Sequence, residues 1–167
     1  MTITSVLTFS TDRSSVLIDA RGPRFGAIIT TVVLTAVLAL QSLPLLIWQL
    51  GVFALGAFLS PQKTPYAFLY KKLVRPRLKG DVPTEDVRPP QFAQIVGFLF
   101  ALGGTIALLL GNALVATIII GFALAAAFLN AAFNFCLGCE MYLLIARFRG
   151  ALKQRTNAED SYNLPSL

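Results

Sequence analysis

The chain has 167 residues, of which 56% are hydrophobic and 13% are charged, and its mean hydropathy is +0.71. These values exclude an ordinary water-soluble domain and predict an all-α integral membrane protein. The net charge of +6 would favour nucleic acid as the partner of a soluble protein. Here the basic residues flank apolar runs, where lipid phosphates and topology explain them more simply. We therefore expect membrane lipid, and no nucleic acid, among the partners.

Two apolar runs in the first half predict a pair of membrane spans. Turn-forming residues 19–24 precede the first span, predicted over 25–40. Pro44 suits the first turn of a second span over 43–59. Both spans are short for a hydrocarbon core of about 30 Å, which favours a tight hairpin. Interfacial residues are expected near one membrane surface, among them Trp48 and Gln49.

The polar connection over residues 60–91 contains an amphipathic stretch. From Tyr66 to Arg75, aromatic and basic side chains alternate at a spacing that predicts a helix lying on the membrane surface. Prolines keep the rest of the connection irregular. Basic side chains here and near the carboxyl end are expected to contact anionic lipid: Lys71, Lys72, Arg75, Arg77, Arg147 and Arg149.

The second half contains an apolar stretch that is too long for one helix. A third span is predicted over 92–110 and a fourth over 113–135. The stretch 113–146 contains a single charged residue, and one helix of that length would extend about 50 Å, well beyond the membrane. We therefore expect a break near Gly138, followed by an amphipathic helix over about 140–154.

The two halves resemble each other, which predicts an internal repeat. Each half begins with Asp-x-Arg-x-Pro, continues through two spans and ends in a segment closed by Arg-x-Arg. An even number of spans per half predicts parallel repeats, here two pseudo-repeated hairpins, each followed by an amphipathic cytoplasmic helix. Coincidence among apolar segments is the alternative. The predicted divisions are a flexible segment over 1–18, a four-helix membrane domain over 19–155 with repeats at about 19–79 and 86–150, and a disordered tail over 156–167.

Charge predicts the orientation. All 14 Lys and Arg residues fall in the amino terminus, the central connection or the carboxyl tail, and neither hairpin turn contains one. By the positive-inside rule both termini, the central connection and both cysteines are expected on the cytoplasmic side. In that reducing compartment a permanent structural disulfide is disfavoured and transient thiol or persulfide chemistry is favoured.

Cys136 and Cys139 are the two cysteines of a chain that has no histidine. If Cys136 begins the exit helix, the positive end of the helix dipole stabilises its thiolate, so Cys136 would attack and Cys139 would resolve the mixed disulfide. The adjacent Glu140 acts against this by raising the thiol pKa. Alternatively, the two small residues only pack beside Gly138. A metal site would need two chains, so no metal or cofactor is expected in one.

Two asparagines lie just before the cysteines. Asn130 and Asn134 are four residues apart and therefore share one face of the fourth span. Polar groups within a membrane usually face the interior of a helix bundle. They are candidates, with Glu140, for lining a site, although hydrogen bonding between helices explains the asparagines more simply.

The block from Ala131 to Tyr142, together with the Asp-x-Arg-x-Pro-x-Phe starts and residues 87–94, resembles the bacterial membrane family called domain of unknown function 4395 over roughly residues 17–149. The family has no established activity. Its members are small membrane proteins often encoded near thioredoxin-like proteins and sulfurtransferases. The resemblance implies the bacterial cytoplasmic membrane as the location and favours sulfur or thiol redox work.

The function expected from these observations is exchange of disulfide or persulfide between the Cys136 and Cys139 pair and a soluble partner at the cytoplasmic face. A thioredoxin-like protein and a sulfurtransferase are the candidate partners, and a second copy of the chain is another. The alternative is a non-enzymatic membrane scaffold, or a carrier of a small solute such as a sulfur compound, in which the cysteines only pack.

Overall fold

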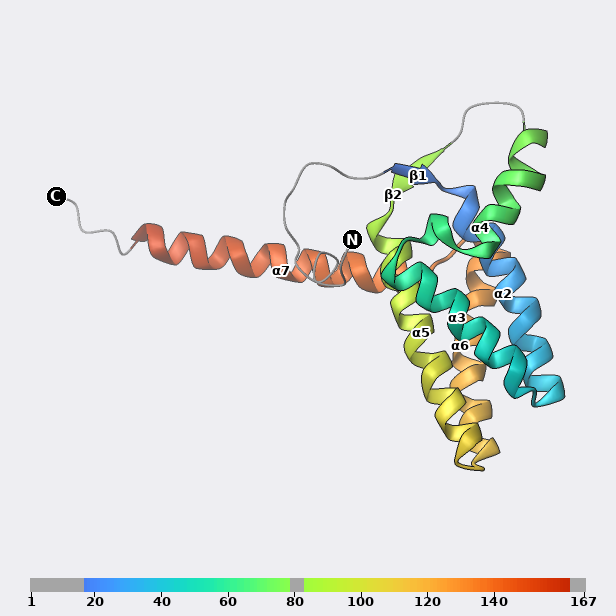
Figure 1. The fold of residues 1–167 in the computed structure, drawn as a ribbon. Helices are drawn as coiled ribbons and strands as arrows, with labels where there is room; N and C mark the ends of the chain where they lie inside the picture. Colours follow the sequence, from blue (N-terminus) through green and yellow to red (C-terminus); the bar gives the residue numbers. More distant parts are fainter. Residues whose placement is uncertain (1–16, 79–82, 163–167) are drawn as a thin grey trace.

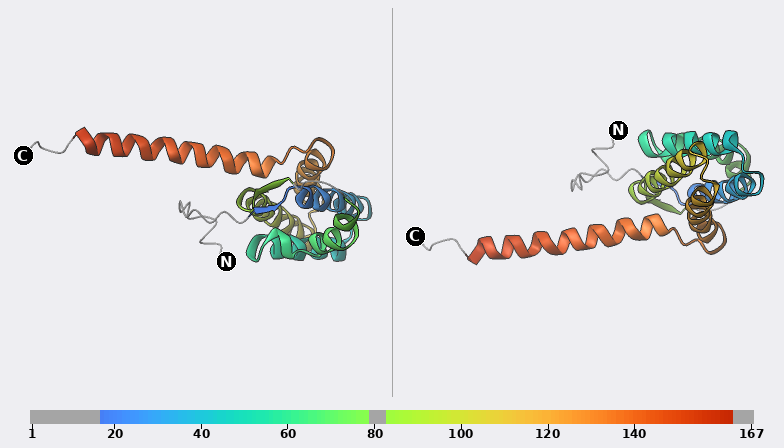
Figure 2. Two further views of the ribbon diagram at one scale, coloured as in Figure 1. Left: turned by 90° about the horizontal axis from the view of Figure 1, so that it is seen from above. Right: turned by 90° about the horizontal axis from the view of Figure 1, so that it is seen from below.

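The computed structural model describes residues 17–78 and 83–162, with side chains up to residue 150. Within this part the chain is predominantly helical, and its long helices pack as a bundle (Figure 1). The bundle helices are α2 (Arg21–Leu40), α3 (Leu43–Phe58), α5 (Arg88–Leu109) and α6 (Ala113–Phe133). Helix α7 (Leu137–Tyr162) starts at one end of the bundle and extends away from it, as the two views of Figure 2 also show.

Among the described residues, three helices are long and apolar enough to cross a membrane: α2 with 20 residues, α5 with 22 and α6 with 21. They identify the chain as a membrane protein. The remaining bundle helix, α3, is equally apolar but has 16 residues, one fewer than the span predicted over 43–59. All four bundle helices occupy the predicted runs, because each run is bounded by proline, glycine or charged residues.

The junctions between the long helices use left-handed backbone. Gln41 follows α2 with φ of 47°, Gly111 follows α5 with φ of 74°, and Asn134 ends α6 with φ of 56°. Glycine and asparagine tolerate this region better than other residues. At the α5–α6 junction the side chain of Asn112 accepts a hydrogen bond of 3.2 Å from the Val115 N–H, so this turn also caps the next helix.

Close helix packing depends on small residues. The most extensive contacts join α3 to α5, α2 to α6, and α5 to α6. A Cβ atom placed on Gly104 would lie 2.7 Å from Ile120 Cγ1, and one on Gly97 would lie 2.7 Å from Phe53 Cε1. Glycine therefore lets these side chains fit against the neighbouring backbone. The buried core consists of Leu34, Val37, Leu46, Phe53, Ala101, Ala107, Ala116, Ile120 and Ala123.

The central connection is helical where an amphipathic helix was predicted, but it is broken into short pieces: η1 (Pro61–Lys63), α4 (Pro65–Leu69), the π-helical turn η2 (Tyr70–Val74) and η3 (Arg75–Arg77). Tyr66 and Tyr70 point into the protein and are buried, whereas Lys71 and Lys72 are exposed. The segment therefore has the two faces that its sequence predicts.

A short strand pair joins the starts of the two halves. Strand β1 (Leu17–Asp19) pairs antiparallel with β2 (Thr84–Asp86), with Ile18 opposite Glu85. Ile18 is 4% exposed. Leu17 and Ile18 thus belong to a packed strand rather than to the flexible segment predicted over 1–18; the rest of that segment lies outside the described residues.

Two boundaries near the carboxyl end differ from the prediction. The chain breaks at Asn134, before the cysteines, and Gly138 lies inside the first turn of α7 rather than at the break. Asn134, in the left-handed conformation, ends the helix at a position where glycine is more usual. Helix α7 also continues to Tyr162, through the first part of the tail predicted to be disordered over 156–167, so the predicted helix end at 154 was too early.

Candidate functional site

The cysteines lie at the junction between α6 and α7. Asn134 ends α6, and its N–H bonds the Asn130 carbonyl at 3.1 Å. Cys136 then occupies the N-cap of α7, because its carbonyl accepts the Glu140 N–H at 3.0 Å. Its Sγ accepts the Cys139 N–H at 3.3 Å, which is the contact that a serine or threonine hydroxyl usually makes at this position. The exit helix was predicted from about residue 140, so it begins three residues earlier than predicted, with Cys136 as its N-cap.

The two sulfur atoms face each other at disulfide distance, and the Cα atoms are 5.2 Å apart. That separation lies within the range that disulfide geometry requires. Both residues are half-buried, so the pair is neither sealed in the core nor fully solvated. The N-cap and the third helical position are one turn apart, which brings these sulfur atoms together without distortion of the helix.

Gly138 lets α7 approach α5 closely. A Cβ atom at this position would lie 2.6 Å from Ala93 Cβ and 2.7 Å from Ala93 Cα. The second contact is with backbone, which cannot move aside as a flexible side chain can. The close packing expected around Gly138 is therefore present, and it holds the cysteine turn against the bundle.

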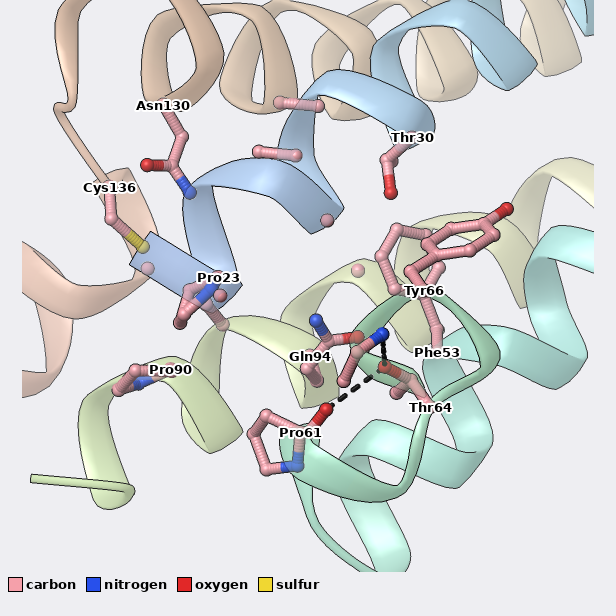
Figure 3. A pocket seen from close by; sticks show the side chains of 18 of the residues that line it. Pro23, Thr30, Phe53, Pro61, Thr64, Tyr66, Pro90, Gln94, Asn130 and Cys136 are labelled. Atoms are coloured by element: carbon pink, nitrogen blue, oxygen red, sulfur yellow. Dashed lines mark hydrogen bonds between the residues drawn. The ribbon is translucent and has the colours of Figure 1, made fainter. Parts of the chain in front are cut away.

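A cavity of about 630 Å³ lies among the bundle helices and the central connection (Figure 3). Its wall is mostly apolar. Cys136 and Asn130 lie on one side of it, and Thr64 and Tyr66 lie on another. Of the predicted site residues in the described part of the chain, Cys136 and Asn130 line this cavity, whereas Cys139, Asn134 and Glu140 do not.

Few polar groups reach the cavity from the membrane helices. Gln94 of α5 is the most informative, because its Oε1 is buried and has no hydrogen-bond partner among the described residues. A Cβ atom on Gly56 would lie 2.7 Å from this oxygen, so glycine makes room for the amide. A buried acceptor without a partner is costly, and this oxygen is packed against Gly56 of α3 rather than open to the cavity.

A buried hydrogen-bonded chain supports another part of the wall. Tyr66 donates to Gln49 Oε1 at 2.8 Å, and Gln49 Nε2 donates to Thr30 Oγ1 at 3.4 Å. Gln49 is 0% exposed, so its side chain faces the interior of the bundle. Burial raises the pKa of Tyr66, and a weaker opposing effect comes from Trp48. Tyr66 therefore stays a neutral donor. The sequence feature that could have indicated this buried hydrogen-bonded chain is a glutamine within an apolar run.

Charged residues reach the cavity from the central connection and from β1. Asp19, Lys71 and Arg75 all line it. Tyr70 donates a hydrogen bond of 2.9 Å to Asp19 Oδ2. Burial, followed by the hydrogen bond to Asp19 and its charge, raises the pKa of Tyr70. This side of the cavity is thus much more polar than the wall made by the membrane helices.

The six basic residues expected to contact lipid all have exposed side chains: Lys71, Lys72, Arg75, Arg77, Arg147 and Arg149. Lys72 Nζ also lies 6.0 Å from the centroid of the Phe68 ring. Lys71 and Arg75 have a second role that was missed, since both line the cavity. No group of three or more metal-binding side chains occurs within residues 17–78 and 83–150.

A family model described as "Domain of unknown function (DUF4395)" matches residues 18–147. The match contains the cysteine turn, all four bundle helices and the central connection. Neither the curated proteins nor the solved structures contain a match to this chain.

Proposed function

We propose, from the premise that the chain belongs to the family described as domain of unknown function DUF4395, that its Cys136 and Cys139 exchange disulfide or persulfide with a soluble partner. One observation carries this proposal: Cys136 Sγ sits at the N-cap of α7, hydrogen-bonded at 3.3 Å to the N–H of its own partner Cys139. A sulfur in that position is stabilised as a thiolate by first-turn N–H groups and by the helix dipole.

The exchange reaction balances on the two sulfurs. The Cys136 thiolate attacks a partner disulfide, forming a mixed disulfide and releasing one partner thiolate. The Cys139 thiolate then attacks Cys136 Sγ, which forms the internal disulfide and releases the second partner thiolate. In the reverse reaction, a partner dithiol reduces the disulfide between Cys136 and Cys139. With a persulfide donor, Cys136 accepts the outer sulfur and Cys139 displaces it as hydrosulfide. A thioredoxin-like protein or a sulfurtransferase is the proposed partner.

The proposed architecture is four membrane spans arranged as two pseudo-repeated hairpins. Matching local contacts at the starts of α2 and α5 support it. Asp19 Oδ1 accepts the Arg21 N–H at 3.0 Å, and Asp86 Oδ1 accepts the Arg88 N–H at 2.9 Å. The aspartates stand at equivalent positions of the two Asp-x-Arg-x-Pro motifs, so the same turn starts both helices.

Aromatic contacts match in the same way. The rings of Phe25 and Tyr70 have centroids 5.7 Å apart, and those of Phe92 and Tyr142 are 5.8 Å apart. In each half, a phenylalanine in the first turns of the opening helix therefore packs against a tyrosine of the exit segment. Equal pairs at equal positions are difficult to attribute to coincidence among apolar runs.

Contacts between the halves match as well. Arg24 of α2 donates to the Ala131 carbonyl of α6 at 3.3 Å, and Gln91 of α5 donates to the Ala57 carbonyl of α3 at 2.9 Å. Arg24 and Gln91 occupy the same position after their aspartates. Each reaches across to the last turn of the second helix in the other half. Two-fold pseudosymmetry about an axis along the bundle would produce this reciprocity.

The helix caps of the exit segments complete the comparison. Thr64 caps α4, and its Oγ1 accepts the Ala67 N–H at 3.2 Å. Cys136 caps α7 and accepts the Cys139 N–H at 3.3 Å. The sulfur pair therefore replaces a threonine and an alanine of the first half. Since a hydroxyl serves for capping, the cap alone does not require cysteine, and this favours a chemical role for the sulfur.

We propose that both termini and the cysteines face the cytoplasm of a bacterial cell. The charge distribution supports this orientation: the cationic central connection lies at the bundle end where α7 begins, and the turns at 41–42 and 111–112 at the opposite end contain no charged residue. A membrane-impermeant thiol reagent should label the reduced cysteines in inverted vesicles and not in intact cells. Labelling in intact cells would reverse the orientation.

Single-serine variants test the exchange. With Cys139→Ser the attacking thiol remains and the resolving thiol is lost, so a mixed disulfide with the partner should accumulate. It should be recovered from membranes after acid quenching and released by a reductant. The double variant, with serine at both positions, is the matched control and should trap nothing. If Cys139→Ser traps no partner at all, the exchange function is refuted.

A carrier for a small solute is the second candidate, and the cavity of about 630 Å³ is the observation that favours it. In that case the cysteines act only through packing. The double-serine variant separates the two functions, because a carrier would retain its solute uptake in membrane vesicles whereas an exchange protein would lose all activity.

A further inference from the structure

The cavity has the character of a site for a ligand that dissolves in the bilayer. It lies among apolar helices, its wall is mostly apolar, and Phe53, Phe100 and Phe122 contribute to it. Its volume of about 630 Å³ falls within the range of about 300–1,000 Å³ that is usual for small-molecule sites. Such a wall favours a largely apolar, ring-containing molecule over a hydrated solute.

Two amides from adjacent helices line this apolar space, Gln94 of α5 and Asn130 of α6. Gln94 Oε1 is buried and has no hydrogen-bond partner among the described residues. An amide carries both an N–H donor and a carbonyl acceptor. The Asn130 amide can therefore donate to the carbonyl oxygen of an oxidised ring and accept from the hydroxyl of the reduced ring, and Gln94 can donate through its N–H group.

A sulfur that changes redox state lies on the same wall. Cys136 lines the cavity together with Asn130, and Figure 3 labels both side chains. Cys139, bonded to it across one helical turn, is not among the lining residues in the described part of the chain. Within the described residues, one member of the pair therefore lines the cavity and the other does not. A dithiol gives up two electrons and two protons when it closes to a disulfide.

We infer that the cavity binds a lipid-soluble quinone, which accepts two electrons and two protons from the reduced Cys136 and Cys139 pair. This inference rests on the proposed thiol exchange, and it names the molecule that reoxidises the pair. The quinone supplies the two-electron acceptor that a dithiol needs, and it reaches the site through the bilayer rather than through water.

The electron transfer balances in two steps. The Cys136 thiolate adds to a ring carbon, forming a carbon–sulfur bond, and the ring takes up one proton. The Cys139 thiolate then attacks Cys136 Sγ. The sulfur–sulfur bond forms, the carbon–sulfur bond breaks with its electron pair going to the ring, and a second proton completes the quinol. The sum is dithiol plus quinone giving disulfide plus quinol.

The test uses the full chain in liposomes, reduced and then freed of reductant under anaerobic conditions. A short-chain ubiquinone analogue is added, quinol formation is followed by ultraviolet absorbance, and remaining thiols are counted by alkylation. We expect one quinol for each pair oxidised, at a rate that saturates with quinone concentration. A rate that rises linearly without saturation is the reaction of an exposed thiol, and it would overturn the inference.

Variants of the two amides locate the site. Gln94→Leu and Asn130→Leu should each raise the half-saturating quinone concentration by about tenfold, the effect expected for one lost hydrogen bond. Thr35→Val is the matched control, because Thr35 is exposed on α2 and bonds only its own helix; it should leave the rate unchanged. Asn130→Gln retains an amide and should restore part of the affinity. Unchanged saturation in both leucine variants would refute the site.

The two proposals fail separately. If Cys139→Ser traps its soluble partner while the reduced wild-type chain shows no saturable quinone reaction, the quinone inference fails and the exchange function stands. If the double-serine variant binds the quinone in equilibrium dialysis while no cysteine variant traps a partner, the exchange function fails, and the electron transfer that rests on it fails too.

Discussion

Tyr70 of the central connection donates a hydrogen bond of 2.9 Å to Oδ2 of Asp19, the last residue of β1. The other oxygen of the same carboxylate, Oδ1, accepts the Arg21 N–H that begins α2. One carboxylate thus fixes the start of a membrane helix and holds the central connection against it.

Removing the Tyr70 hydroxyl should weaken this link. Tyr70→Phe is expected to lower the free energy of unfolding by about 1 kcal/mol, the usual net value of one hydrogen bond. Asp19→Ala should cost more, since it removes both contacts. Denaturant titration in detergent micelles measures both values. Equal stability of Asp19→Ala and the wild type would show that the carboxylate contributes nothing.

The buried chain through Gln49 allows a double-mutant test. Tyr66→Phe leaves Gln49 Oε1 buried without its donor, which should cost about 1–3 kcal/mol. Combining it with Gln49→Leu removes both partners and should recover much of that loss, because an apolar pair needs no hydrogen bond. Unfolding free energies of the two single variants and the double variant give the coupling. If the losses of unfolding free energy in the two single variants simply add in the double variant, the two side chains are not coupled.

Gly138 and Gly150 form a matched pair on α7. Gly138→Ala brings a Cβ atom within 2.7 Å of Ala93 Cα, so it should cost about 1–3 kcal/mol through overpacking. Gly150 has open space around it, and alanine there should stabilise the helix by up to about 1 kcal/mol. Thermal unfolding in detergent compares the two. A tolerated Gly138→Ala would mean that α7 does not pack on α5 in solution.

Glu85 should make stability depend on pH. Burial, and secondarily the charge of Asp19, raises its pKa above the ordinary value of 4.5. The folded state therefore holds this proton more tightly than the unfolded state, so stability falls as pH rises from 4.5 through the folded pKa. Glu85→Gln removes that loss. Its melting temperature should exceed that of the wild type near neutral pH, with the difference shrinking toward the acidic end.

Cys136→Thr separates capping from chemistry. Thr64 already caps α4 with its hydroxyl, so threonine at 136 should preserve the cap of α7. Because Cys136 is half-buried and lines the cavity, the melting temperature should fall by no more than about 4 °C, the effect of about 1 kcal/mol in a chain of this size. Reaction with the partner and with quinone should be abolished. If Cys136→Thr retains both reactions, the sulfur is dispensable and the cysteines only pack.

The helices were predictable from the sequence because apolar runs ended at turn-forming residues, as at Pro44 and Asn112. The length limit on the fourth span predicted a break before an exit helix, although that helix begins earlier than the predicted start at about 140. The cavity did not follow, since nearly uniform apolar helices such as α5 and α6 do not indicate which face turns inward.

The β1–β2 pair was equally hidden. Three-residue strands such as Leu17–Asp19 are too short to show an alternating pattern, and their pairing depends on helices that are distant in sequence. The break was predicted at Gly138 beside Asn134 and Glu140, and it lies at Asn134, where the left-handed conformation accepted asparagine.

The N-cap residues of α4 and α7 make the two sides of the cavity chemically different. Thr64 caps α4 and Cys136 caps α7, and both line the wall, yet one offers a hydroxyl and the other a sulfur. A homodimer of two-helix hairpins would present identical ends, and a bound molecule would fit equally well in two opposite poses. A single chain with unlike ends would select one pose, so the reacting part of the proposed quinone would arrive at the sulfur.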